Sequence, residues 1–288
     1  MLKTTVIGLG AMGAGMAGNL HRAGMLHGAW NRTRERGETI AKQHGFELSA
    51  NLSNAVTGAD LVITCVSADA DLLEVSEKLA ELLSPGTTVL DTSTVNSDTA
   101  RQVSGLFTAR DIQFLDGPVS GGREGAEKGT MVMMVGGDEQ ALEHIMPALE
   151  VISSRVMHMG PVGNGQATKA VNQIMCAGIN QAVSEALAFG QSNGLDMNKV
   201  IDVVSGGAAG NWFLDHRGKN MCNGIFEPGF RLALHHKDLK ICQAMAAQHD
   251  VKLPTVEMTL IHYDRLMDQG HGDEDISALF RLKKAMFE

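Results

Sequence analysis

Residues Thr4–Leu20 read TTVIGLGAMGAGMAGNL, and this stretch decides the fold of the first half of the chain. Thr4–Ile7 has the β-branched, apolar character of a buried strand, and apolar residues recur at helical spacing from Met16 onwards. Between them lies the motif GxGxxG, which runs from Gly8 to Gly13. Its first glycine permits a tight turn, its second lets the backbone approach a pyrophosphate, and its third lets the helix pack against the strand. A strand, this motif and a helix in succession predict a dinucleotide-binding site.

The second predicted strand ends at Trp30, where an acidic residue that would bind a ribose 2'-hydroxyl is expected and is missing. The residues that follow offer an amide, a guanidinium and a hydroxyl, which suit a 2'-phosphate, so we expect NADP to be preferred and NAD to be possible. The alternative is that Arg32 is an arginine on a solvent-exposed loop. The glycine motif and this turn supply the first expected cofactor contacts, which are Gly8, Leu9, Gly10, Ala11, Met12, Gly13, Asn31, Arg32 and Thr33.

Strand-like and helix-like segments continue to alternate up to about residue 160, as in a doubly wound α/β sheet. Ligands of such sheets bind at the carboxyl ends of the strands, so Val66, Ser67 and Thr94 are expected to contact the cofactor. For Thr94 the equal alternative is that its polar cluster only caps the following helix. The later expected strands are Ala59–Val66, Thr87–Asp91, Asp111–Leu115 and Gly129–Val135.

The stretch Gly160–Gln173, GPVGNGQATKAVNQ, marks a change of architecture, because helical periodicity continues after it almost without strands. We therefore predict an NAD(P)-binding Rossmann domain at residues 1–162 and an all-α substrate and oligomerisation domain at residues 163–288, joined by a long helix. Lys169 falls in the first turns of that helix, at the expected interdomain cleft. Asn172 and Gln173 follow on or beside the same face, where they can bind the same small ligand.

A second glycine-rich segment, DGPVSGG at Asp116–Gly122, can direct backbone N–H groups and one hydroxyl at an anion such as a carboxylate. Ser120, Gly121 and Gly122 are therefore candidate substrate contacts. Two aromatic residues, Trp212 and Phe230, complete the expected substrate-binding set. For Trp212, which follows another glycine-rich loop, packing in the core is the alternative.

The composition limits the possible classes of function. A net charge of -9 argues against general binding of nucleic acids, and no apolar run reaches the roughly 18 residues of a membrane span. The 4 cysteines lie far apart without a CxxC pair, which fits a reducing, cytoplasmic location. Adjacent histidines at His235 and His236 do not have metal-ligand spacing, so no metal site is expected. The expected partner is a small molecule.

Four distinct motifs follow one another along essentially the whole chain. They are GLGAMGAGMAGNL at Gly8–Leu20, DGPVSGG at Asp116–Gly122, GNGQATKAVNQ at Gly163–Gln173 and HKDL at His236–Leu239. With them the chain resembles the β-hydroxyacid dehydrogenase family, which includes 3-hydroxyisobutyrate dehydrogenases, tartronate semialdehyde reductases, and glyoxylate and succinic semialdehyde reductases. The resemblance implies a homodimer or homotetramer. It also implies roles for single residues: Ser120, Gly121 and Gly122 would bind the substrate carboxylate, Lys169 would be the catalytic acid/base, Lys237 would lie beside the nicotinamide, and Thr94 would contact the cofactor.

The chemistry can be argued physically, since hydride transfer to a carbonyl carbon leaves an alkoxide that a positioned ammonium can stabilise and protonate. The resemblance implies an oxidoreductase that acts on a small 3-hydroxy acid or semialdehyde. Gln173 replaces the asparagine that many members carry, and tartronate semialdehyde reductases look similar here, which favours short semialdehydes. One alternative is an imine reductase-like enzyme, although such enzymes generally lack the lysine found at Lys169. The other is an NADP-binding module that has lost catalysis.

Overall fold

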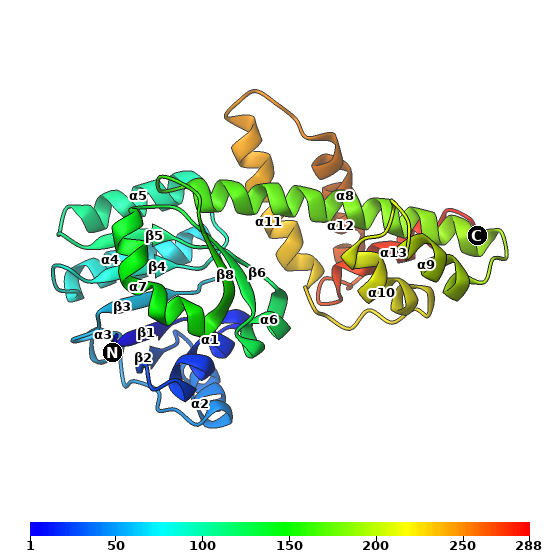
Figure 1. The fold of residues 1–288 in the computed structure, drawn as a ribbon. Helices are drawn as coiled ribbons and strands as arrows, with labels where there is room; N and C mark the ends of the chain where they lie inside the picture. The colour runs from blue at the N-terminus through cyan, green and yellow to red at the C-terminus, as the bar shows by residue number, and fades with distance from the viewer. The chain divides into compact units, whose positions relative to one another are not determined.

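The computed structural model describes residues 1–288 and divides the chain into two compact units, Met1–Lys169 and Ala170–Glu288. The boundary between the units falls inside a long helix, α8 (Asn164–Ser192). The sequence predicts this long helix correctly. The predicted fold class is confirmed: helices flank a parallel sheet in the first unit, and the second unit is helical (Figure 1). None of the helices is both long and apolar enough to cross a bilayer.

The first unit is built on a five-stranded parallel sheet with the strand order β2-β1-β3-β4-β5. The strands are β1 (Thr4–Ile7), β2 (Leu26–Trp30), β3 (Leu61–Thr64), β4 (Thr88–Asp91) and β5 (Gln113–Asp116). Successive side chains of a strand point to opposite faces, so Val6 packs into one core and Ile7 into the other. This burial on both faces explains why the central strands are apolar without alternation.

Helices cover both faces of this sheet (Figure 1). One core includes side chains of α1 (Ala11–Arg22), α6 (Gly122–Lys128) and α7 (Glu139–Ile152), together with Ala41 of α2 (Arg34–His44). The other core includes side chains of α3 (Leu52–Val56), α4 (Asp69–Leu82) and α5 (Ser97–Thr108). The sheet is therefore doubly wound, as expected.

A smaller sheet follows, and part of it escaped prediction. It contains β6 (Val119–Ser120), β7 (Met131–Val135) and β8 (Ser153–His158), with β6 antiparallel and β8 parallel to β7. A bridge between Asp116 and Gly136 connects it to β5. Strand β8 was not expected, because SSRVMH has no apolar run and is held by pairing with β7; the domain was expected to end on a helix. Helix α6 was not expected either, since its sequence GREGAEK is short, contains two glycines and continues a glycine-rich loop.

The second unit packs its helices around one core centred on fully buried Tyr263. The Tyr263 hydroxyl accepts a hydrogen bond of 3.0 Å from the Asn180 side chain, which also donates to the Ile276 carbonyl. Trp212 begins a helix that was not expected. The helical spacing predicts one last helix over Asp275–Phe287, whereas this segment begins with a 3-10 turn that leads directly into the final α-helix. After α8 the helices are α9 (Met197–Ser205), α10 (Trp212–Cys222), α11 (Leu232–Ala247), α12 (Pro254–Asp268), the 3-10 turn η1 (Ile276–Ala278) and α13 (Leu279–Ala285).

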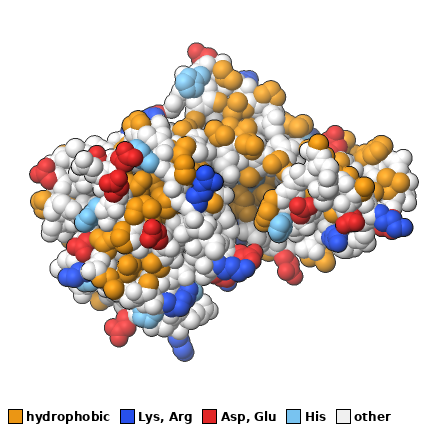
Figure 2. All heavy atoms as spheres, viewed as in Figure 1, with side chains coloured by type: hydrophobic (Ala, Val, Ile, Leu, Met, Phe, Trp, Pro, Cys, Tyr) orange, Lys and Arg blue, Asp and Glu red, His pale blue; other side chains and the backbone are white.

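Several charged side chains form exposed pairs on helix surfaces. Arg34 with Glu38 and Arg123 with Glu127 are i,i+4 pairs at 2.7 Å. Figure 2 shows basic and acidic side chains interspersed over the face in view. Exposed pairs of this kind contribute only about 0.2–1 kcal/mol each, so the charges that matter for function are those inside the site.

Candidate active site

The glycine motif has the backbone geometry that a pyrophosphate site requires. Gly8 has a φ of +93°, and a Cβ there would lie 2.2 Å from the Cys65 carbonyl oxygen. A Cβ on Gly13 would lie 2.0 Å from the Gly8 carbonyl oxygen. A Cβ on Gly10, by contrast, would meet no atom within 4 Å, and no side chain caps the N-terminus of α1. The open space beside an uncapped helix N-terminus fits a dinucleotide pyrophosphate.

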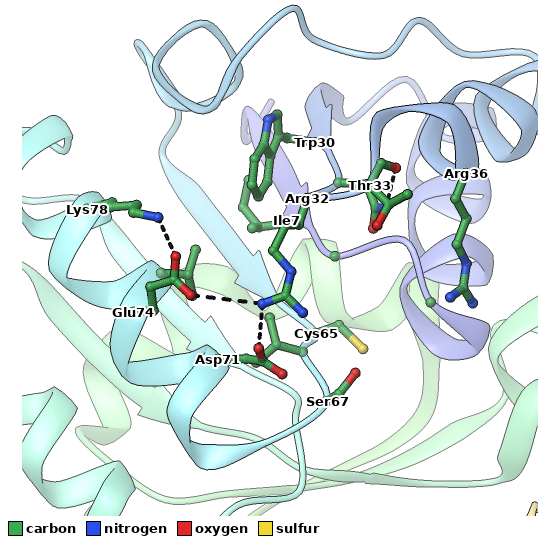
Figure 3. Close-up of a pocket in the computed structure, with 15 residues that line it drawn as sticks. Ile7, Trp30, Arg32, Thr33, Arg36, Cys65, Ser67, Asp71, Glu74 and Lys78 are labelled. Carbon is green, nitrogen blue, oxygen red and sulfur yellow. Dashed lines mark hydrogen bonds and ion pairs between the residues drawn. The ribbon is translucent and has the colours of Figure 1, made fainter.

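A cavity of about 310 Å³ adjoins this loop at the carboxyl ends of β1, β2 and β3 (Figure 3). Its volume lies at the lower end of the range for small-molecule sites. Of the residues predicted to bind cofactor, those that line it are Gly8, Gly10, Asn31, Arg32, Thr33, Val66 and Ser67. The residues predicted to bind cofactor that do not line it are Leu9, Ala11, Met12, Gly13, Thr94 and Lys237.

Asn31 braces the glycine loop. Its side-chain oxygen accepts a 2.9 Å hydrogen bond from the Leu9 backbone N–H, and its amide nitrogen donates at 2.8 Å to the Thr33 carbonyl. Both polar ends of the side chain are therefore used within the protein. The neutral amide at the end of β2, interpreted from sequence as a cofactor contact, holds the loop in shape.

Arg32 reaches across the cavity to acidic residues of α4 that were not expected there from the sequence. Its Nη1 lies 2.5 Å from Asp71 Oδ1 and 3.9 Å from Glu74 Oε2. The hydrogen bond to Asp71 raises the pKa of Arg32. Glu74 also pairs with Lys78 at 2.6 Å, and this hydrogen bond lowers the pKa of Glu74. Arg36, a further cation missed from sequence, lines the cavity from α2 (Figure 3).

A buried polar network fixes the loop after β4, which contains Thr94. Asp91 accepts hydrogen bonds from the Thr64 and Ser93 hydroxyls at 2.8 and 2.7 Å. The Ser93 hydroxyl in turn accepts from the Val66 backbone N–H at 2.8 Å. Burial raises the pKa of Asp91 to about 6, and its Oδ2 has no hydrogen-bond partner.

Gln166, in the first turn of α8, holds the same loop from the other side. Its amide donates to the Ser93 carbonyl at 2.9 Å and accepts from the Val95 N–H at 3.1 Å. The Ser97 hydroxyl adds a 3.0 Å bond to the Gly163 carbonyl. The start of α8 and the loop around Thr94 are therefore fastened to each other.

Asp116 anchors the N-terminus of α8. Its carboxylate accepts from the Gly163 N–H at 2.7 Å and from the Gln166 N–H at 2.9 Å. The residue is fully buried, and burial raises its pKa to about 6 against the lowering effect of these bonds. Close packing completes the anchor, because a Cβ on Gly165 would lie 2.4 Å from the Met134 carbonyl oxygen.

Lys169 lies one turn further along α8 and is buried, with only 7% of its surface exposed. Its Nζ donates a 2.9 Å hydrogen bond to the Val119 carbonyl. Val119 directly precedes Ser120, Gly121 and Gly122, and both glycines have positive φ, +131° and +63°. The structure thus brings the predicted lysine next to the predicted carboxylate-binding segment. Buried lysines are uncommon, which makes the position informative.

The remaining predicted residues belong to the second unit, where three of them form a chain of contacts. The Asn172 amide donates to Gln173 at 2.7 Å, and the Gln173 amide donates to Asp238 at 2.6 Å. Asp238 also pairs with Lys237 at 3.0 Å. Asp238 lies within the motif HKDL, but the motif does not indicate this contact, since it depends on how α8 packs against α11.

The two aromatic candidates differ in burial. Trp212 is 61% exposed and stacks on His216, with ring centroids 4.2 Å apart, so the alternative of core packing is wrong for it. Phe230 is half-buried and packs against the core of the second unit. Its ring lies 5.4 Å from that of His235.

The fold and the glycine loop define the class of protein: an oxidoreductase of the NAD(P)-dependent dehydrogenases, with a dinucleotide site at the carboxyl edge of its parallel sheet. Residues 3–160 match the NAD binding domain of 6-phosphogluconate dehydrogenase, and residues 163–283 match the NAD-binding domain of NADP-dependent 3-hydroxyisobutyrate dehydrogenase. The chain belongs to the β-hydroxyacid dehydrogenase family.

Individual relatives agree with this assignment over nearly their full length. An uncharacterized oxidoreductase of Shewanella frigidimarina is 36% identical, with 99% of each chain covered. An NAD-dependent L-serine dehydrogenase of Pseudomonas aeruginosa is 33% identical over 98% of each chain. The solved structure of a Mycobacterium tuberculosis 3-hydroxyisobutyrate dehydrogenase with L-serine superposes with a TM-score of 0.88 at 31% identity, covering 98% of this chain and 99% of that one.

Proposed function

We propose that this protein transfers a hydride between NADP(H) and a small 3-hydroxy acid or its semialdehyde, with Lys169 as general acid/base. The observation that carries the proposal is the position of Lys169. Its side chain is buried, and its Nζ donates a 2.9 Å hydrogen bond to the Val119 carbonyl, directly beside Ser120, Gly121 and Gly122. A cation and an anion-binding segment side by side are what a hydroxy carboxylate needs, since one part binds the carboxylate and the other acts on the hydroxyl.

Lys169 has one task in each direction of the reaction. The bound cofactor supplies or accepts the hydride. During reduction Lys169 stabilises the developing alkoxide and gives it a proton, and during oxidation it removes the hydroxyl proton. The hydrogen bond to Val119 restricts the rotamers of the lysine, so less entropy is lost when substrate binds.

The substrate class follows from the proposed carboxylate contacts. Ser120, Gly121 and Gly122 would bind the carboxylate, and Asn172, Gln173, Trp212 and Phe230 remain candidates for the rest of the substrate pocket. L-serine, the substrate named for the Pseudomonas aeruginosa relative, is itself a small 3-hydroxy acid. Within this class, Gln173 favours a short semialdehyde as the substrate.

We propose NADP as the preferred cofactor and NAD as a usable one. Arg32, Thr33 and Arg36 line the cavity at the end of β2 and can donate to a 2'-phosphate. Gly8 to Gly13 would hold the pyrophosphate, Val66, Ser67 and Thr94 would contact the middle of the cofactor, and Lys237 would lie beside the nicotinamide.

Initial rates test this function, with small 3-hydroxy acids assayed with NADP+ and NAD+, and semialdehydes and cyclic imines assayed with NADPH and NADH. We expect turnover with hydroxy acids or semialdehydes, and a loss of about a hundredfold to ten-thousandfold in kcat for Lys169→Met. Binding of NADPH to this variant, followed by nucleotide fluorescence, is expected to stay close to that of wild type.

Other outcomes would contradict the proposal in distinct ways. Turnover of cyclic imines alone would indicate the imine reductase alternative. Tight NADPH binding without turnover of any compound would indicate the inactive binding module. A Lys169→Met enzyme that retains more than about a third of wild-type kcat would remove the lysine from the mechanism.

A further inference from the structure

The cavity at the end of β2 contains a carboxylate that the end of β2 itself lacks. Asp71, on α4, lines the cavity, and its side chain is only 22% exposed, against 67% for Arg32. Figure 3 shows Arg32 extended across the cavity, with its guanidinium ending on Asp71, while Arg36 stands apart on the α2 side. Two residues from separate elements therefore meet where the adenosine ribose of a dinucleotide is expected.

An arginine engaged in this way is not freely available to a phosphate. Carboxylates and phosphates compete for the same guanidinium donors, because both accept its N–H groups in similar geometry. Asp71 already holds Nη1 at 2.5 Å. A 2'-phosphate that enters the cavity is left with the Nε and Nη2 donors unless it shares or displaces this contact, and its charge of nearly −2 is repelled by the Asp71 carboxylate.

The same carboxylate favours the cofactor without the phosphate. NAD sites use an acidic side chain to accept hydrogen bonds from the ribose hydroxyls, usually from the end of the second strand. In this chain that strand end provides Asn31, whose polar groups are already used by Leu9 and Thr33. Asp71 brings the missing kind of acceptor into the cavity from a different element.

We propose that Asp71 is a specificity-determining residue that pairs with Arg32 and lowers the preference of this protein for NADP over NAD. The proposal rests on the proposed function of Arg32 as a 2'-phosphate contact. The proposal predicts that substitution of one side chain outside the β2 turn changes the ratio of the NADPH and NADH affinities. It also predicts that the pair is broken or shared when NADPH binds.

The test compares the dissociation constants of NADPH and NADH for the full-length protein by nucleotide fluorescence at fixed ionic strength. Asp71→Asn keeps the size of the side chain and removes its charge. We expect NADPH to bind about threefold to tenfold more tightly to this variant, which is the size expected from removing one partly screened charge. NADH is expected to bind no more tightly than to wild type.

Glu77→Gln is the matched control, because it removes the same charge from an exposed position of α4 that does not line the cavity. We expect it to change the NADPH dissociation constant by less than about twofold, since a distant exposed charge is screened. A gain for Glu77→Gln as large as that for Asp71→Asn would overturn the proposal, because net charge alone would then explain the effect.

Arg32→Ala separates the role of the arginine from that of the carboxylate. If it leaves NADPH binding unchanged, the role proposed for Arg32 fails, and the proposal for Asp71 fails with it. If Arg32→Ala weakens NADPH but Asp71→Asn leaves NADPH unchanged, or tightens both cofactors alike, only the proposal for Asp71 is overturned. If Asp71 competes with the phosphate for Arg32, Asp71→Asn should increase the affinity for NADPH less in the Arg32→Ala background than in the wild-type background.

Discussion

Replacing Asp116 by asparagine is expected to lower activity while leaving the free energy of unfolding nearly unchanged. The carboxylate accepts hydrogen bonds from the Gly163 and Gln166 N–H groups at 2.7 and 2.9 Å. An asparagine amide can accept from only one of them, and its NH2 group faces the other. A buried donor left without an acceptor costs about 1–3 kcal/mol.

Burial of the charge acts in the opposite direction. The pKa of Asp116 rises from 3.8 to about 6 in the folded protein, even with both hydrogen bonds made. One pKa unit corresponds to about 1.4 kcal/mol, so at pH 8 the ionised carboxyl costs the folded state about 3 kcal/mol, which asparagine removes. The two effects are of similar size. We therefore expect the free energy of unfolding at pH 8 to change by less than about 2 kcal/mol in either direction.

For the catalytic rate, in contrast to stability, no second effect offsets the loss of the Asp116 carboxylate. Asp116 holds the first turn of α8, and Lys169 lies on the next turn with its Nζ fixed on Val119. A small displacement of a catalytic group can cost about a hundredfold in rate. We expect kcat of Asp116→Asn to fall by about tenfold to a hundredfold, with KM for the cofactor changed less.

The assay combines initial rates with urea unfolding at pH 5 and pH 8. Because the folded pKa of Asp116 lies above 3.8, the folded protein binds this proton more tightly than the unfolded chain, and stability from this group is lost as the pH rises from about 4 to about 6. The stability of the variant relative to wild type should therefore increase from pH 5 to pH 8. Unchanged kcat would refute the positioning role, and a loss of more than about 2 kcal/mol at pH 8 would refute the compensation.

Other expected outcomes test separate parts of the structure. Gly13→Ala should weaken NADPH binding by about tenfold or more, since its Cβ would lie 2.0 Å from the Gly8 carbonyl oxygen. A fluorescence titration of the folded variant with NADPH measures this, and a dissociation constant equal to that of wild type would contradict the loop geometry. Asp91→Asn should gain stability relative to wild type as the pH rises from about 4 to about 6, because burial raises the pKa of Asp91 to about 6. The same difference in urea midpoint between variant and wild type at both ends of that range would contradict this expectation. Light scattering at micromolar concentration should return a multiple of 30.7 kDa, and the monomer mass would contradict a homo-oligomer.

Sequence could predict the features that depend on local chemistry. The turn at Gly8 needs a positive φ, which glycine adopts readily, so the motif alone locates the loop. The buried strands reveal themselves by continuous apolar runs, and α8 by its long helical period. Strand β8 has no such signal, because its place depends on a partner strand and not on its own pattern.

Contacts between elements distant in the chain could not be predicted in the same way. Arg32, which the sequence predicts as a cofactor contact, lines the cavity, yet its pairing with Asp71 depends on the strand order that places α4 beside the β2 turn. Asn31 has the donor and acceptor groups of a cofactor contact, but its oxygen accepts from Leu9 of the glycine loop and its amide donates to Thr33 in the turn after β2. Residue type therefore indicates what a side chain can bind, and only the packing decides which partner it has.

The position of Lys169 shows why this distinction matters for mechanism. Sequence periodicity assigns Lys169 to the helix that opens the second half of the chain, whereas the contacts described for it and for the start of α8 lie within Met1–Lys169. The first turn of α8 is thus held by Asp116 on one side and by the Ser93 loop on the other. If the lysine is the general acid, its alignment is set by the unit that also holds the glycine loop. Substitutions at Gln166 should then lower kcat without any contact to substrate, because they release the turn that carries the lysine.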